Sequence, residues 1–524
     1  MYTNTSVPNM DLRAFDIELL NDLKVSLKAF LKKYEAFLKT LPALIESHSQ
    51  ARQFLEENQK RLCSSFQQLK PRLDTFDNSN AKETEQLLKR YSNEFSLSFR
   101  SNLHLISFGE KLKTLLMLGQ LLQSTDDNQL NVLEENVLAL RKLQTTQLEQ
   151  SMIVTKQPPP VLMAGKCIET EVRWLANISP VSPSLRIRII KADDAEKLIS
   201  GEAISDEIAS PASITENCTE LLEYGDIWIS HFNKKPLLKT VKKSWQDDGK
   251  QSSSGEDGKY VLLYEIAPVL GKGETSSNLH PIWTISHPFI LISNSADYCD
   301  AFATVLWSRA FKDEKEIEWS TLSAVLNKVF DYLTGGTKRS LSESDLLYFR
   351  RKLGVRRDSD TVSLKRFSKN NVEPDVTFSF WSWFFHVCKI IKKNSLPYWE
   401  KGYLMGFDTK ESIAKKISVD HKCCFLLRFS DSQLGSLSIS RFDFDYTGEQ
   451  RHTAFLLPPD QELYALVTLL DNFDQLKDIH YFRGKDLKSI DKKLLLCDPD
   501  LKLTEITTFN PTWKRAVLKC IQNI

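Results

Sequence analysis

The first 150 residues carry a helical pattern of hydrophobic positions. Apolar side chains recur at three- and four-residue steps from about Leu12 to Gln150, a spacing typical of amphipathic helices that pack together. Turn-forming or helix-capping residues fall near positions 42–49, 77–80 and 125–128. These three breaks give four stripes, so we expect an antiparallel four-helix coiled-coil bundle over residues 11–151.

The pattern changes after the run Pro158-Pro159-Pro160. Short β-branched and aromatic runs now alternate with polar, Gly- and Ser-rich stretches, which predicts an immunoglobulin-like β-sandwich or barrel over residues 152–308. Helical patterns return from Trp319 to Lys393, so we expect a helical region at 309–396. The expected strands are residues 171–176, 185–190, 227–232, 260–266, 282–286 and 289–293.

A strand near position 428 places a charge inside an apolar run. Period-two alternation puts Phe425, Leu427 and Phe429 on one face and Leu426, Arg428 and Ser430 on the other. A guanidinium stays protonated and is rarely buried without a partner, so Arg428 needs an anion. Two interpretations are open: a phosphate held by the arginine and nearby hydroxyls, or a purely structural role, as an ion pair or as an arginine snorkelling at a sheet edge, which the pattern alone favours.

Composition narrows the class of protein. The chain has 524 residues, 69 Lys plus Arg and 68 Asp plus Glu, so it is long enough for several domains and has no overall charge to attract a polyanion. Nine cysteines without a Cys-x-x-Cys pair indicate reduced thiols, neither a disulfide framework nor a zinc site. We find no signal-peptide pattern and no apolar run of about 18 residues, and expect no membrane insertion.

Catalytic motifs are missing from the sequence. A Walker lysine loop, a nucleophile elbow, a His-Glu-x-x-His motif and a dinucleotide glycine fingerprint are all absent. We therefore expect a non-enzymatic protein without a metal or cofactor.

Several segments resemble the signal transducers and activators of transcription, the STAT family. The run Phe425-Leu-Leu-Arg-Phe-Ser-Asp-Ser resembles the phosphotyrosine-pocket strand of that family's Src homology 2 domain, and residues 398–407 and 435–440 are similar to the segments on either side. Residues 153–159, 290–294 and 303–307 resemble the borders of its DNA-binding domain, and residues 338–342 and 378–383 its helical linker. The resemblance implies a multidomain α+β protein with five segments: a coiled-coil domain (11–151), a DNA-binding domain (152–308), a linker (309–396), a Src homology 2 domain (397–495) and a tail (496–524).

The resemblance implies a phosphotyrosine site at Lys410, Arg428, Ser430 and Ser432, with Asp431 between the serines. Lys410 would lie in the first turn of a helix, where a cation opposes the helix dipole unless an anion is bound nearby. Asp408 and Glu411 have the spacing of a capping box at the start of that helix.

For DNA, the resemblance implies a base-reading role for Asn294 and backbone contacts from Lys191, Lys239, Lys242 and Lys243. Residues 152–308 hold 15 Lys plus Arg against 20 Asp plus Glu, an acidic balance that is unusual for a DNA-binding module. Read alone, the lysine cluster is a solvated loop; phosphate contacts from it would make binding fall steeply with salt.

Tyrosines end early in this chain. Activated family members pair when a phosphotyrosine beyond one Src homology 2 domain enters its partner's pocket, whereas the last tyrosine here is Tyr481. The helical pattern also begins close to Met1, so we expect a short form without the family's amino-terminal oligomerisation domain and without the tail phosphoacceptor.

The resemblance implies a transcription factor of the cytoplasm and nucleus. It would be recruited by a tyrosine-phosphorylated receptor or adaptor in growth or defence signalling, and would bind a palindromic DNA duplex as a homodimer. The alternative is a phosphotyrosine-binding adaptor that does not bind DNA, which the missing tail tyrosine favours. An intact Ser293-Asn294 loop and the lysine cluster favour the transcription factor.

Overall fold

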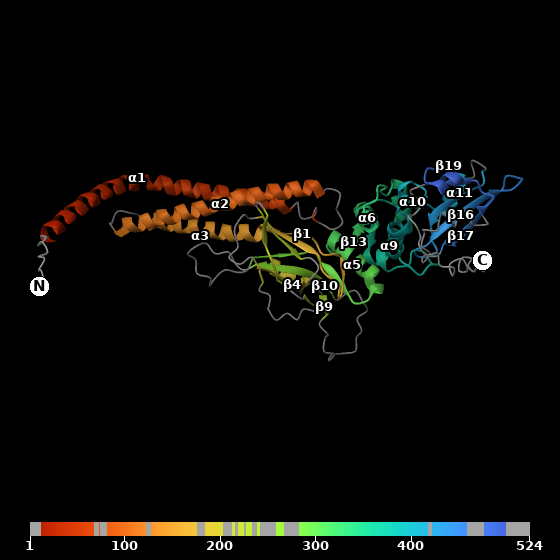
Figure 1. Ribbon diagram of the computed structural model, residues 1–524, viewed down its shortest axis with the longest axis horizontal. Coiled ribbons are helices and arrows are strands. Elements are labelled where there is room, and N and C mark those ends of the chain that lie inside the picture. The colour runs from red at the N-terminus through yellow and green to blue at the C-terminus, as the bar shows by residue number, and fades with distance from the viewer. Residues whose placement is uncertain are drawn as a thin grey trace, which may run out of the picture.

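The computed structural model describes residues 12–67, 73, 81–121, 127–175, 184–202, 212–214, 218–224, 227–232, 238–240, 258–266, 282–417, 422–457 and 476–498. The molecule is elongated (Figure 1). A helical bundle occupies one end of the molecule, and a β domain lies beside the half of that bundle nearer the middle. A helical linker leads from the β domain to a separate sheet domain at the other end.

Three long helices form the amino-terminal bundle: α1 (Leu12–Gln67), α2 (Ala81–Leu121) and α3 (Asp127–Gln150). The breaks near 77–80 and 125–128 are confirmed. The break expected near 42–49 is wrong, and with it the four-helix bundle, because the first two stripes belong to one continuous helix with Pro42 inside it.

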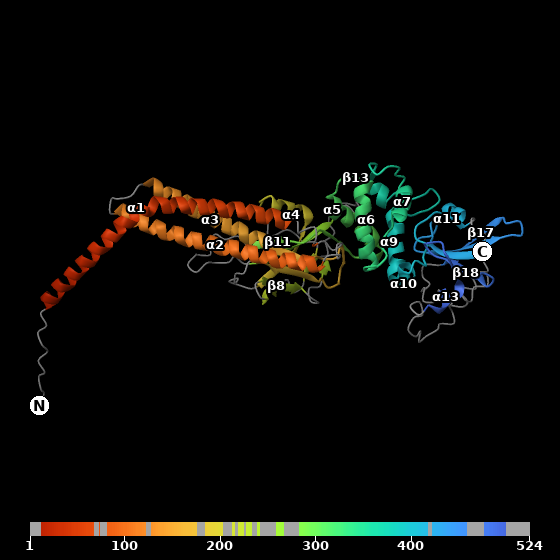
Figure 2. The ribbon, with the colours of Figure 1, turned by 90° about the horizontal axis from the view of Figure 1, so that it is seen from above.

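Packing explains why α1 continues through Pro42. An interior proline costs a helix about 3 kcal/mol, but Leu41 and Ile45 on either side of it are buried against α2 and α3. Full burial of each such side chain contributes about 1.5–3 kcal/mol, which offsets the loss. The amino-terminal part of α1 leaves the bundle at an angle (Figure 2), as expected for a helix with an internal proline.

Two sheets form the β domain. The first has the order β1-β3-β8-β7 and the second β2-β12-β10-β4-β6, with β11 paired to β10. A separate pair joins β5 to β9. The strands of the first sheet are β1 (Met152–Lys156), β3 (Thr170–Trp174), β7 (Leu222–Tyr224) and β8 (Ile227–Phe232). Those of the second are β2 (Val161–Met163), β4 (Ser184–Lys191), β6 (Cys218–Glu220), β10 (Lys259–Ile266), β11 (Ile282–Ile285) and β12 (Phe289–Ile292), and the pair is β5 (Ala212–Ile214) and β9 (Leu238–Thr240).

The two sheets share one core, and β10 shows how. Its residues Leu262 and Tyr264 face that core, while Val261 and Leu263 pack on the other side with helix α4 (Ala192–Ile199). The buried Tyr264 hydroxyl donates to Thr170 Oγ1 at 2.8 Å, a bond between the sheets. All six expected strands are present and form a two-sheet sandwich.

Helices dominate the linker, as expected. Its elements, with the turn that precedes them, are η3 (Ser295–Asp297), α5 (Tyr298–Phe311), β13 (Glu316–Glu318), α6 (Trp319–Thr334), α7 (Glu343–Lys352), β14 (Thr361–Ser363), α8 (Leu364–Ser368), α9 (Phe380–Ile390), the π-helical turn η4 (Ile391–Ser395) and α10 (Leu396–Glu400).

The carboxyl-terminal domain is a five-stranded sheet of order β17-β16-β15-β18-β19. Helix α11 packs on one face of β15 through Ile413 and Ile417, and Phe425, Leu427 and Phe429 on the other face enter the core of the linker. The elements are α11 (Lys410–Ile417), β15 (Cys424–Phe429), β16 (Leu437–Phe444), β17 (Gln450–Leu457), β18 (Tyr481–Arg483), β19 (Ser489–Asp491) and α13 (Lys492–Cys497).

The linker and the carboxyl-terminal sheet share one hydrophobic core, which also includes Val161 of β2 and Ile292 of β12. Trp381, Trp383 and Trp399 are fully buried in it. Arg339 lies over the Trp399 ring at 3.7 Å and donates to the carbonyls of Trp399 and Leu404. The expected boundary at residues 396/397 therefore passes through a continuous core.

Candidate functional site

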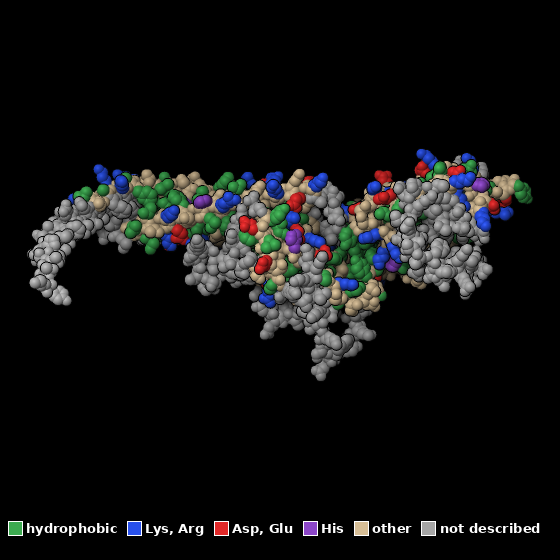
Figure 3. Space-filling view, in the orientation of Figure 1, with side chains coloured by type: hydrophobic (Ala, Val, Ile, Leu, Met, Phe, Trp, Pro, Cys, Tyr) green, Lys and Arg blue, Asp and Glu red, His purple; other side chains and the backbone are tan. Residues whose placement is uncertain are grey.

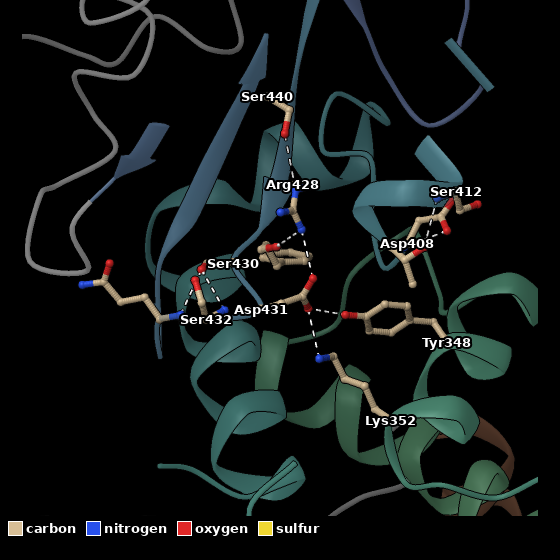
Figure 4. A network of polar contacts seen from close by, with 12 residues as sticks. Tyr348, Lys352, Asp408, Ser412, Arg428, Ser430, Asp431, Ser432 and Ser440 are labelled. Carbon is tan, nitrogen blue, oxygen red and sulfur yellow. Dashed lines mark hydrogen bonds and ion pairs between the residues drawn. The ribbon is translucent and has the colours of Figure 1, made fainter. Parts of the chain in front are cut away.

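Arg428 lies near the end of the central strand β15, opposite Ser438 of β16. The residue is 8% exposed. Its Nε contacts Ser440 Oγ at 3.4 Å, and its Nη1 contacts both the Phe429 carbonyl at 3.4 Å and Asp431 Oδ2 at 3.0 Å (Figure 4). Among the described residues its Nη2 group has no hydrogen-bond partner. An anion that binds this guanidinium through two parallel bonds would use the free Nη2 and would compete with Asp431 for Nη1.

Asp431 connects this arginine to the linker. One carboxylate oxygen pairs with Arg428, and the other accepts a hydrogen bond from the Tyr348 hydroxyl and lies 3.1 Å from Lys352 Nζ. Tyr348 and Lys352 both come from helix α7, and Figure 4 shows them approaching the carboxylate from the side opposite Arg428. Two cations and a hydroxyl therefore converge on one carboxylate.

The linker side of this network is buried. The Lys352 side chain is 5% exposed and has a second carboxylate, that of Glu373, at 3.3 Å. Burial, and after it the charge of Asp431, raises the pKa of Tyr348 far above its usual range. Tyr348 consequently stays protonated and donates its hydrogen bond throughout the physiological pH range.

The loop after β15 is held by its own backbone and by the linker. Ser430 Oγ accepts from the backbone N–H groups of Ser432 and Gln433 at 3.3 and 3.0 Å, and the Ser430 carbonyl accepts from Trp383 Nε1 at 2.9 Å. Ser430 is buried and Ser432 is exposed. The Ser430 oxygen therefore shapes the loop, and its hydroxyl proton is left to donate to a ligand.

This geometry has features of both interpretations of Arg428, the structural ion pair and the anion site. The arginine does form an ion pair with a carboxylate of its own chain. That carboxylate belongs to a surface loop and its side chain is 26% exposed, so it occupies a position that an incoming anion could take. The pair resembles a closed anion site more than a core salt bridge.

Lys410 is the first residue of α11, as expected, but its side chain lies outside the described residues. The capping box is wrong. Thr409 caps the helix by accepting from the Ser412 N–H at 3.1 Å, and Asp408 instead pairs with Lys416 at 2.5 Å. Thr409 is one position closer to the helix start, so its hydroxyl reaches the first-turn donors.

The proposed DNA contacts are only partly described. Lys191 at the end of β4 and Asn294 after β12 are both exposed and lie at the same end of the second sheet, because Tyr260 of β10 pairs with both Lys191 and Phe289. Asn294 Oδ1 accepts from the Ala296 N–H at 3.0 Å, which leaves Nδ2 to donate. Of the lysine cluster, the side chain of Lys239 on β9 and the whole of Lys242 and Lys243 lie outside the described residues.

Sequence reasoning missed the linker residues of the site. Tyr348, Lys352 and Trp383 lie 47–83 positions before the residues that they contact after β15, and no local pattern joins such distant segments. The only signal was the aromatic run around Trp383.

Other features concern the whole described chain. Seven of its cysteines are present as thiols. Within the described ranges, no group of three or more His, Cys, Asp or Glu side chains is arranged to hold a metal ion. No described helix combines the length and the apolar character needed to cross a bilayer.

Fold and site together define a multidomain α+β protein in which a helical linker is built into a sheet domain with a candidate anion site. The profile of one family, described as the linker domain of signal transducer and activator of transcription, matches residues 308–384. Residues 308–384 are therefore a STAT linker domain, and this match supports the resemblance to the STAT family seen in the sequence.

Curated relatives are similar over most of this chain. "Signal transducer and activator of transcription 1" of Caenorhabditis elegans is 29% identical over 447 residues, covering 79% of this chain and 62% of that protein. The protein of the same name from Caenorhabditis briggsae is 29% identical over 68% of this chain and 54% of its own. "Signal transducer and transcription activator" of Drosophila melanogaster is 26% identical over 64% of this chain and 44% of its own. The chain thus spans about three fifths of the first relative and about half of the second.

Proposed function

We propose that this protein is a signal transducer that binds phosphotyrosine at Arg428 and regulates transcription by binding DNA as a dimer. The observation that carries the first half is the nearly buried guanidinium on β15, whose one ion pair is with Asp431 of the following loop and whose Nη2 has no hydrogen-bond partner among the described residues. The similarity to STAT proteins is consistent with a protein that is not an enzyme. We expect it in the cytoplasm and the nucleus, with a tyrosine-phosphorylated receptor or adaptor upstream.

A phosphotyrosine phosphate carries about −1.5 to −2 charges. Arg428 would bind it with a two-pronged fork, Ser430 and Ser432 would donate their hydroxyls, and Lys410 would supply a second cation. Binding of the phosphate requires the Asp431 carboxylate to break its ion pair with Arg428. The carboxylate would still have partners, because Tyr348 and Lys352 contact its other oxygen.

Binding of a fluorescent phosphotyrosine peptide tests this half. Arg428→Ala should weaken binding by about 2–5 kcal/mol, because the phosphate would be left without its main partner. Arg428→Lys should recover only part of the loss, since an ammonium cannot form the fork. Equal binding of phosphorylated and unphosphorylated peptide by the unaltered protein would refute the proposal.

DNA binding rests on the similarity to STAT proteins and on the shared position of Lys191 and Asn294 at one end of the β domain. Asn294 would donate to a base edge and the lysines would contact the backbone. Titration of a palindromic duplex at several salt concentrations measures both. Asn294→Ala should reduce preference between sequences, whereas Lys239, Lys242 and Lys243 changed together to Ala should weaken all duplexes alike and flatten the salt dependence.

The adaptor without DNA binding remains the second candidate. The acidic balance of residues 152–308, with 15 basic and 20 acidic side chains, favours it, because that surface would repel a polyanion outside any local basic patch. Absence of duplex binding by folded protein at low salt, with phosphopeptide binding intact, would support the adaptor.

A further inference from the structure

A tight hairpin joins β16 to β17 and projects from the end of the molecule (Figure 1). Its turn closes through bonds from Gly448 N to the Asp445 carbonyl and from Asp445 N to the Glu449 carbonyl, both 3.0 Å. The Asp445 carboxylate accepts from the N–H groups of Thr447 and Glu449 at 2.9 Å, and Gly448 supplies the positive φ of 80°. Asp445 and Gly448 therefore specify this turn.

Tyr446 follows Asp445 in the turn, and the turn does not need it. Position two of such a turn accepts most residue types. The Tyr446 side chain is 100% exposed and makes no hydrogen bond or ring contact with the described residues. Hydrophobic-class side chains, which include tyrosine, lie at the outer end of the hairpin in Figure 3. An aromatic ring contributes to stability by burial, so this one adds nothing to the fold.

Acidic residues surround the tyrosine. Asp443 and Asp445 precede it and Glu449 follows it. Arg441 is held by Asp443 in a two-bond pair at 2.6 and 3.0 Å, and Arg451 lies 3.7 Å from Asp445. Charge patterns of this kind select among kinases, because a basic substrate groove attracts an acidic segment.

We propose that Tyr446 is a phosphorylation site for an ATP-dependent protein tyrosine kinase. In the transfer the phenolic oxygen passes its proton to a carboxylate base of the kinase and bonds to the γ-phosphorus of ATP. The bond from that phosphorus to the β–γ bridging oxygen breaks, and ADP leaves with the electron pair. The proposal goes beyond phosphotyrosine binding at Arg428 and does not depend on it.

The phosphate would be presented to another molecule. Arg428 pairs with Ser438, and Tyr446 lies eight residues beyond Ser438 along β16 and its turn. At about 3.3 Å per residue the two sites are roughly 25 Å apart, so the group cannot reach the pocket of its own chain. A phosphotyrosine-binding domain of a separate protein is the reader that this position fits.

Site-resolved mass spectrometry tests the proposal. The full chain is incubated with Mg-ATP and a recombinant tyrosine kinase domain that is active on a Glu–Tyr copolymer. Tyr446 should gain phosphate first, about tenfold or more faster than Tyr224. Tyr224 is the matched control, because it is 75% exposed but paired in the edge strand β7.

Two variants test the tyrosine and the neighbouring acidic residues separately. Tyr446→Phe should remove the fast phosphate and leave the unfolding curve unchanged. Asp443→Asn with Glu449→Gln should slow phosphorylation several-fold, since neither side chain holds the turn. Phosphate on Tyr224 with Tyr446 unmodified would overturn the proposal, and so would a Tyr446→Phe chain that is labelled as fast as the original.

Discussion

Replacing Asp431 by asparagine should strengthen phosphopeptide binding. Asparagine has nearly the same shape and its carbonyl oxygen can still accept from Tyr348 and Lys352, so the loop keeps its attachment to α7. What is lost is the negative charge that pairs with Arg428 at 3.0 Å. In the unaltered protein a phosphate must displace that carboxylate before it can bind the arginine.

The size of the gain follows from the pair. A hydrogen bond between charged groups contributes about 1.5–3 kcal/mol, equivalent to roughly a tenfold to hundredfold change in Kd. The Asp431 side chain is 26% exposed while that of Arg428 is 10% exposed, so water screens part of the interaction. We therefore expect the lower end of the range, about a tenfold lower Kd.

Fluorescence polarisation with one phosphotyrosine peptide measures the change at constant pH and salt. Asp358→Asn is the matched control: it removes a carboxylate that pairs with Arg350 of the same helix α7 at 2.7 Å but lies on the surface. That variant should bind like the original protein. If Asp431→Asn bound as weakly as Arg428→Ala, the carboxylate would be positioning the arginine for its ligand and the argument for displacement would fail.

Three further predictions concern stability and reactivity. Trp399→Ala should lower the free energy of unfolding by about 3–5 kcal/mol. Hydrogen exchange should show the linker and the carboxyl-terminal sheet losing protection together in one unfolding transition. Separate transitions for the two segments would contradict a shared core. Because burial raises the pKa of Cys299 to about 12, mass spectrometry should find it far less alkylated at pH 8 than the exposed Cys167. Burial lowers the pKa of His386, so the unfolded chain takes up that proton first and the histidine costs stability below about pH 6.5; urea midpoints of His386→Gln should fall less on acidification than those of the original protein.

Local periodicity was enough to find most of the elements. The alternation of Phe425, Leu427 and Phe429 with Leu426 and Arg428 identified β15 and its two faces, because a strand with distinct neighbours on each side leaves that trace in its sequence. The six expected strands of the β domain carry similar runs. Three-residue strands such as β5 and β9 were missed, since a segment that short has no period to detect.

Some features depend on tertiary contacts and could not be predicted from the hydrophobic pattern of the sequence. Pro42 predicted a helix end, and the burial of Leu41 and Ile45 against two other helices overrode it. At the site, Arg428 was found because a charge in an apolar strand is conspicuous. Its connection through Asp431 to Tyr348 and Lys352 depends on how α7 packs against the sheet, which only the folded chain reveals.

The continuous core between linker and carboxyl-terminal sheet limits how this protein can be divided. A cut at residue 396 would uncover Trp399 on one fragment and Trp383 on the other, and both pieces would present large apolar faces to water. Recombination that exchanges the sheet alone would meet the same obstacle, so these two segments should be inherited, expressed and engineered as one unit.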